Sequence, residues 1–157
     1  MKPDIRRAVP DDARQVAVLA GEALNEMMSM IGKSGFRFRL AEMIAERAAF
    51  LECGEYAIYI ASTPRGHPLG FLTLFESQAN HISDPFGTVA ELYVRPEYRR
   101  RGIGHWLLEQ AKSHARSHRW TSLQLAMPAS VQPGGALAFF ERKRFADAGG
   151  RKMKLAL

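Results

Sequence analysis

The sequence has almost no cysteine, which limits both its cross-links and its metal sites. Cys53 is the one cysteine among 157 residues, so an intrachain disulfide and a multi-cysteine zinc site are excluded. Long apolar runs are also missing, since no stretch approaches the roughly 20 residues that span a bilayer. The first residues, MKPDIRRAVPDD, lack the apolar segment of a secretory signal. We therefore expect a cytoplasmic protein with no membrane partner.

Acidic residues are too few to balance the basic ones. Lys and Arg number 22 against 16 Asp and Glu, which gives a net charge of +6 at pH 7. The excess favours an anionic partner, such as nucleic acid, an acidic membrane surface or a phosphate-bearing small molecule. The basic residues gather at Arg95–Arg101, Lys112–Arg119 and Arg142–Arg144, all in the C-terminal half.

Internal repeats and low-complexity linkers are absent too, and the length fits one domain. Apolar periods predict helices at 12–30, 37–52, 103–114 and 136–144, and strands at 4–9, 55–62, 69–77, 88–94 and 121–127, with two short strands around Gly149-Gly150. The turn at 64–68 predicts an antiparallel hairpin, and the strand–helix–strand run at 88–127 predicts a parallel crossover. The order β–α–α–β–β–β–α–β–α–β–β indicates an α/β fold whose central mixed sheet is flanked by helices.

The stretch VRPEYRRRGIGH, residues 94–105, follows an apolar strand and opens a predicted helix. The start of a helix leaves about four N–H groups without partners and carries roughly half a positive charge. Gly102 and Gly104 remove two side chains, so a bulky anion can approach the backbone. The three preceding arginines add positive charge. These features predict a phosphate or pyrophosphate site, whereas a glycine turn on a basic surface is the simpler structural interpretation.

The run Arg99-Arg100-Arg101-Gly102-Ile103-Gly104 resembles the (Gln/Arg)-x-x-Gly-x-(Gly/Ala) signature of the GCN5-related N-acetyltransferase (GNAT) superfamily. The preceding ELYVRPEYR and the order of elements are similar to that family as well. The resemblance implies a single N-acetyltransferase domain over residues 1–157. It also implies that acetyl-CoA donates an acetyl group, without a metal, to a primary amine of a small molecule, peptide or protein. The identity of that amine stays open, and so does the oligomeric state, although homodimers are common in the family.

The resemblance further implies which residues hold the donor. The N–H groups expected to bind the CoA pyrophosphate belong to Arg100, Arg101, Gly102, Ile103, Gly104 and His105. The 3′-phosphate of CoA would meet one of the side chains of Arg99–Arg101. The backbone of Leu92, Tyr93 and Val94 would pair with the pantetheine arm, beside a bulge that splays the fourth and fifth strands.

Glu91 is the candidate catalytic base, because it is an acid within an otherwise apolar strand. It could instead bind a cationic acceptor, or be a strand glutamate whose hydrogen bonds are satisfied. Tyr93 shares its strand face by period-two alternation and is the second catalytic candidate. The tyrosine that in this family protonates the leaving thiolate is replaced by Phe140. Either water, Tyr93, Tyr98 or Ser130 protonates the thiolate, or this step needs little help.

Two other functions compete with this interpretation. Phe140 motivates a CoA-binding protein that has lost catalysis. The net charge motivates a nucleic-acid-binding domain, but the chain lacks a recognition-helix or aromatic-platform signature, so we do not expect nucleic acid as a partner. His114 and His118 have the i, i+4 spacing of a ligand pair; without an acidic or cysteine partner, we expect no metal site.

Overall fold

The structure, a computed structural model, describes residues 2–30, 32, 39–77, 84–126, 136–147 and 152–157. The helices are α1 (Ala13–Met30), α2 (Leu40–Cys53), α3 (Ile103–Ser117) and α4 (Ala136–Arg142), with short 3-10 turns η1 (Pro10–Asp12) and η2 (Pro96–Tyr98). The strands are β1 (Asp4–Arg7), β2 (Tyr56–Ser62), β3 (Pro68–Ser77), β4 (Phe86–Val94), β5 (Ser122–Ala126), β6 (Ala146–Asp147) and β7 (Lys152–Ala156). The predicted order of elements is confirmed. Ser130, the predicted start of the second helix and the Gly149-Gly150 turn lie outside the described residues.

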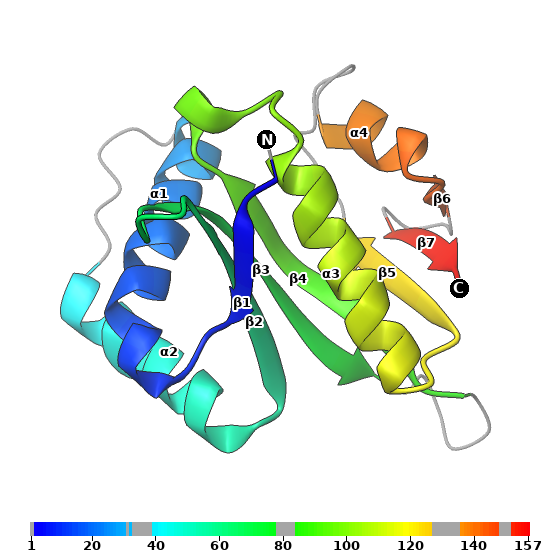
Figure 1. The fold of residues 1–157 in the computed structure, drawn as a ribbon, viewed down its shortest axis with the longest axis horizontal. Helices are drawn as coiled ribbons and strands as arrows, with labels where there is room; N and C mark the ends of the chain where they lie inside the picture. The colour runs from blue at the N-terminus through cyan, green and yellow to red at the C-terminus, as the bar shows by residue number, and fades with distance from the viewer. Residues whose placement is uncertain (1, 31, 33–38, 78–83, 127–135, 148–151) are drawn as a thin grey trace.

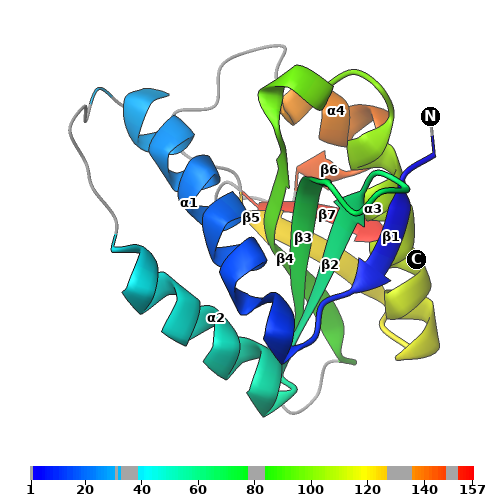
Figure 2. The ribbon, with the colours of Figure 1, turned by 60° about the vertical axis from the view of Figure 1, so that its left-hand side comes forward.

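The strands form one mixed sheet of seven, in the order β1-β2-β3-β4-β5-β7-β6. β4 and β5 run parallel, and the other neighbours are antiparallel. Because α3 links the parallel pair, the predicted crossover is confirmed. The ribbon in Figure 1, seen again from the side in Figure 2, has α1 and α2 on one side of the sheet and α3 on the other. Within the described ranges, no helix is both long and apolar enough to cross a membrane.

Alternation along the strands divides the buried side chains between two cores. Ile58 and Ile60 of β2 pack with residues of α1, whereas Ala57 and Tyr59 pack with residues of α3. The same alternation holds in β4. Tyr93 belongs to the α1 core, while Leu92 and Val94 pack against the α3 core. Consecutive residues at the end of β4 therefore face the two helical layers in turn.

Candidate functional site

A bulge interrupts β4 at Ala90, immediately before the candidate base. On β3, Thr73 pairs with Glu91 but the next residue, Leu74, pairs with Val89, so Ala90 is an extra residue in β4. Among the described residues, β4 pairs with β5 only through residues 87–89. Beyond the bulge, no described strand lies along the β5-facing edge of residues 91–94. Such an edge can hydrogen-bond to an extended ligand.

The chain passes from β4 into α3 through a turn with two left-handed residues. Arg100 has a φ of 63° and Gly102 a φ of 83°. Gly102 is the N-cap of α3, and its carbonyl accepts the N–H of Trp106 at 3.1 Å. The N–H groups of residues 103–105 come before this first helical bond and so lack an acceptor within the helix. A Cβ atom at Gly102 would meet no atom within 4 Å, so the space beside the turn is open.

The second glycine of the turn has a different physical role. A Cβ atom at Gly104 would lie 3.4 Å from the ring of Phe139 in α4 and 4.0 Å from Val94 Cγ2. These are ordinary van der Waals distances, so the first turn of α3 packs against α4 and the end of β4 with room for a small side chain at position 104. Of the two glycines, Gly102 is therefore the one whose backbone conformation favours glycine.

Two arginines tie this turn to α1. The Nε of Arg95 donates to both carboxylate oxygens of Glu22 at 3.1 Å. Arg99 donates from both terminal nitrogens to Glu26, at 2.8 and 2.6 Å, and from Nε to the carbonyl of Val94 at 2.7 Å. The Arg99 guanidinium holds the pKa of the Glu26 carboxyl below its usual range, although partial burial opposes this. The Arg99 side chain is therefore engaged with α1, while Arg100 is exposed.

Glu91 is held by three hydrogen bonds on the face that α2 covers. Arg47 donates to its two carboxylate oxygens at 2.5 and 2.7 Å, and the Thr73 hydroxyl donates at 2.8 Å. The side chain of Arg47 is 9% exposed and that of Glu91 is 29% exposed. The Nε of Arg47 is buried and has no partner among the described residues. A carboxylate offers about four acceptor positions, so one remains for a further donor.

Tyr93 lies on the same face as Glu91, as strand alternation predicts. It is buried in the α1 core, and the Arg99 guanidinium sits 5.6 Å from the centre of its ring. Burial raises the pKa of the Tyr93 phenol, and the nearby carboxylates Glu22 and Glu26 raise it further. The phenol is therefore protonated at neutral pH and can donate a hydrogen bond.

Phe140 packs with its neighbours in a purely aromatic setting. Its ring lies 5.2 Å from that of Phe139 and 5.5 Å from that of Phe145, and the residue is buried. It supplies no proton. Tyr98, at the end of η2, is half-buried beside the α3 core, and the Arg101 guanidinium lies 5.7 Å from the centre of its ring. Tyr93 and Tyr98 are the described hydroxyl candidates for helping a leaving thiolate.

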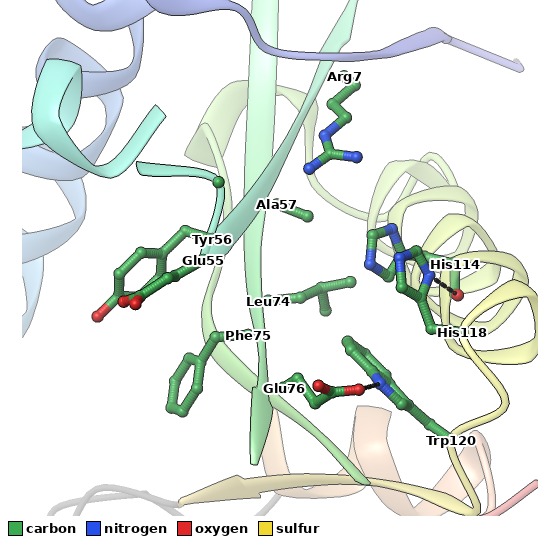
Figure 3. A pocket seen from close by; sticks show the side chains of 11 residues that line it. Arg7, Glu55, Tyr56, Ala57, Leu74, Phe75, Glu76, His114, His118 and Trp120 are labelled. Atoms are coloured by element: carbon green, nitrogen blue, oxygen red, sulfur yellow. Dashed lines mark hydrogen bonds between the residues drawn. The ribbon is translucent and has the colours of Figure 1, made fainter. Parts of the chain in front are cut away.

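A cavity of about 470 Å³ lies elsewhere on the molecule. The side chains of His114, His118 and Trp120 line it, and none of the predicted site residues does (Figure 3). The predicted acetyl-transfer site consists of an open strand edge and the start of a helix, which do not enclose a volume. The position of this cavity therefore does not mark that site. Among the described residues, no group of three or more His, Cys, Asp or Glu side chains is placed to hold a metal ion.

Sequence reasoning missed the partners of the site residues. Arg47 stands four residues from Met43 and from Leu51, both of which pack against the α1 core. A basic residue on the apolar stripe of a helix needs a buried acid, so the signal was present. Glu22 and Glu26 have i, i+4 spacing on α1, but nothing local indicates their arginine partners.

The sequence matches the family model described as "Acetyltransferase (GNAT) family" over residues 24–144. That range contains the bulge, the open edge of β4, the glycine turn and the Arg47–Glu91 pair. No curated protein matches the chain at a level that would indicate a relative.

Several solved structures share the fold. An aminoglycoside acetyltransferase, HMB0005, from an uncultured soil metagenomic sample is 22% identical, with 91% of each chain covered and a TM-score of 0.71. The ribosomal-protein-alanine N-acetyltransferase from Brucella melitensis biovar Abortus 2308 is 20% identical, with 94% of this chain and 95% of that chain covered and a TM-score of 0.71. A possible acetyltransferase from Clostridium difficile 630 is 16% identical, with 96% and 94% covered and a TM-score of 0.77.

Proposed function

This chain belongs to the acetyltransferase (GNAT) family, and we propose that it is an acetyl-CoA-dependent N-acetyltransferase, with residues 1–157 as one catalytic domain. The acceptor is a primary amine, and the acetyl group passes to it directly in a ternary complex. One observation carries this proposal: pairing between β4 and β5 ends at the Ala90 bulge, directly ahead of the glycine turn. An open backbone edge and an anion-binding helix end then follow each other along the chain.

The main chain would hold the donor on both sides of the turn. The N–H groups of residues 102–105 bind the pyrophosphate, because they lie at the positive end of a helix dipole and those of residues 103–105 lack an acceptor within the helix. The exposed side chains of Arg100 and Arg101 serve the 3′-phosphate, since Arg99 is engaged with Glu26. The open edge at Leu92–Val94 pairs with the amides of the pantetheine arm.

Glu91 would receive the acceptor amine. The Arg47 guanidinium and the Thr73 hydroxyl already donate to its oxygens. Taking a proton would require the carboxylate to give up part of this bonding, so acting as the base itself is the less favoured of its two roles. The remaining acceptor position suits one N–H of the amine or of a bound water. Glu91 then orients the amine, and water carries the proton away.

The chemical step forms one bond and breaks another. The amine nitrogen attacks the thioester carbonyl carbon, the new C–N bond forms, and the C–S bond breaks. A backbone N–H near Val94 polarises the carbonyl oxygen. Tyr93 donates a hydrogen bond to the leaving thiolate, whose weak basicity makes it a good leaving group. The proton lost by the amine finally resides on the CoA thiol.

A matched pair of glycine variants tests the donor site. Gly102→Asp places a negative charge at the turn, and Gly66→Asp places the same residue at a turn with φ +84° and equally open space. Both variants carry the same backbone strain, so we expect weaker acetyl-CoA binding in calorimetry for Gly102→Asp only. Equal donor affinity in the two variants would refute the proposed pyrophosphate site.

Turnover separates the enzyme from a protein that only binds CoA. Release of CoA is measured with a panel of amines that includes an aminoglycoside and a peptide with N-terminal alanine, the acceptors suggested by the names of two proteins of this fold. We expect turnover with at least one amine. Donor binding without turnover on any amine would instead favour the CoA-binding protein that Phe140 motivates.

A further inference from the structure

The cavity on the α3 face is far from the proposed acetyl-transfer site. It lies at the C-terminal end of α3, whose 15 residues separate it from the glycine turn by about 22 Å. Its floor is formed by β1, β2 and β3, and its wall by the end of α3 and the residues after it. In the close-up of Figure 3, Arg7 lies at one end, Glu76 at the other, and Ala57 and Leu74 between them.

Hydrogen bonds and stacking hold the aromatic side chains that form the wall of this cavity. His114 Nδ1 and the Tyr59 hydroxyl are hydrogen-bonded at 2.8 Å, and His118 Nδ1 donates to the His114 carbonyl at 2.9 Å. The two imidazoles stack with their centres 4.1 Å apart. The Trp120 indole N–H donates to Glu76 at 2.7 Å. Side chains held in this way cannot collapse into the cavity, so it is preorganised for a ligand.

Trp120 is also seated tightly against the sheet. A Cβ atom at Gly87 of β4 would lie 2.2 Å from the indole ring, so only glycine leaves room for Trp120 there. The indole thus forms a rigid apolar wall next to Leu74. A ligand in the cavity would meet this surface with an apolar group.

The charges in the cavity are separated along its length. Burial lowers the pKa of His114 to about 4, so this part of the wall is uncharged near pH 7. Arg7 supplies a cation from β1, and Glu76 supplies anionic charge from β3. Neither Arg7 nor Glu76 belongs to an ion pair among the described residues. β1 and β3 are two strand spacings apart, about 10 Å. The strand register places Arg7 level with Leu72, and Glu76 lies four residues further along β3, about 13 Å. The Cα atoms of Arg7 and Glu76 are therefore roughly 16 Å apart.

We propose that this cavity binds a zwitterion of dipeptide size. The ligand's carboxylate pairs with Arg7, its ammonium pairs with Glu76, and an apolar side chain packs on Leu74 and Trp120. A dipeptide spans about 7 Å, and a hydrogen bond at each end extends its reach to about 13 Å. The side chains of Arg7 and Glu76 cover the remaining few ångströms between their Cα atoms. A free amino acid is shorter by one residue, about 3.5 Å, and would leave a correspondingly wider gap.

Alanyl-leucine and two blocked derivatives test this site. The N-acetyl derivative lacks the ammonium, and the C-terminal amide lacks the carboxylate. Binding of each is measured by calorimetry and by intrinsic fluorescence, to which Trp106 and Trp120 both contribute, with the protein free of CoA. We expect each blocked derivative to bind about three- to tenfold more weakly than alanyl-leucine, as for a partly exposed ion pair.

Two variants assign the ends of the ligand. Arg7→Gln should weaken alanyl-leucine but not its amide, and Glu76→Gln should weaken alanyl-leucine but not its N-acetyl form. Arg65→Gln, in the exposed turn after β2, is the control and should change nothing. Equal binding of all three compounds, no binding at millimolar concentration, or an unchanged affinity in Arg7→Gln would overturn the proposal. Because neither variant touches the glycine turn or Glu91, these results do not depend on whether the acetyl-transfer proposal holds.

Discussion

The pair formed by Arg47 and Glu91 should be strongly coupled in stability, and its two members should differ in the cost of their removal. Glu91→Gln leaves a guanidinium whose side chain is only 9% exposed, without its counter-charge. Arg47→Met leaves a carboxylate that is 29% exposed, which water can reach and to which Thr73 still donates. The first change should therefore be the more destabilising.

The expected sizes follow from these exposures. Breaking a buried ion pair costs about 3–5 kcal/mol, and the partial exposure of Glu91 places Glu91→Gln near about 3 kcal/mol. Arg47→Met should cost about 1–2 kcal/mol, as for a lost hydrogen bond to a group that can still be hydrated. The double variant removes both charges and should come within about 1 kcal/mol of the natural chain. The coupling energy is then about 3 kcal/mol.

Urea denaturation followed by circular dichroism measures these free energies of unfolding, and Glu42→Gln serves as the control. Glu42 pairs with Arg39, but both side chains are largely exposed, so no measurable loss is expected. Losses that simply add in the double variant would refute the coupling. Activity separates a structural role of Glu91 from its proposed role in orienting the amine: the double variant should be stable yet lose about 100-fold in rate, as for a misplaced substrate. A stable double variant with full activity would show that Glu91 only holds α2 against β4.

Three further outcomes are expected. Glu26→Gln removes the ion pair with Arg99 that holds the glycine turn on α1, and it should raise the KM for acetyl-CoA several-fold. Glu42→Gln is the control and should leave this KM unchanged. An unchanged KM in Glu26→Gln would show that the turn keeps its position without the ion pair. The pKa of His114 is about 4 in the folded protein and about 6.5 in the unfolded chain, so the free energy of unfolding should fall as pH drops from 6.5 to 4, by about 3 kcal/mol at most. His114→Leu should flatten this part of the pH profile of unfolding. An equal slope in both proteins would contradict the lowered pKa of His114. Gly87→Ala forces a methyl group against Trp120 and should cost about 1–3 kcal/mol in urea unfolding and shift the indole emission; an unaltered spectrum would show that the ring can move aside.

The element order was predictable because each segment carries its own period. In α1, Val16, Leu19 and Ala20 follow helical spacing, and all three are buried in the core. The bulge position was not predictable in the same way. Ala90 becomes the extra residue only through the register with β3, which shifts between Thr73 and Leu74. The resemblance placed a bulge near Leu92–Val94, and the structure has it two residues before that segment.

The partners of the site residues were beyond local pattern reading for a related reason. The Arg47–Glu91 pair joins residues 44 apart, and the Arg99–Glu26 pair joins residues 73 apart. Such pairs depend on how α1 and α2 lie on the sheet, which periodicity leaves undetermined. Periodicity does indicate that Arg47 faces the core, and burial then requires an acid partner. It does not indicate which of the acids fulfils this requirement.

The contacts of Arg95 and Arg99 with α1 reduce the positive charge that the basic cluster at residues 95–101 can offer to an anion. Arg95 and Arg99 are engaged with Glu22 and Glu26 one turn apart on α1, so their charge is largely compensated there. The charge available to an anion at the turn comes instead from the exposed Arg100, its exposed neighbour Arg101 and the helix end itself. Because α1 and α2 also pack against each other, these two helices and the turn proposed to hold the donor form one connected unit. A change on α1 can therefore alter donor affinity without touching the donor, and for this reason Glu26 should affect the KM for acetyl-CoA although it lies on another layer of the fold.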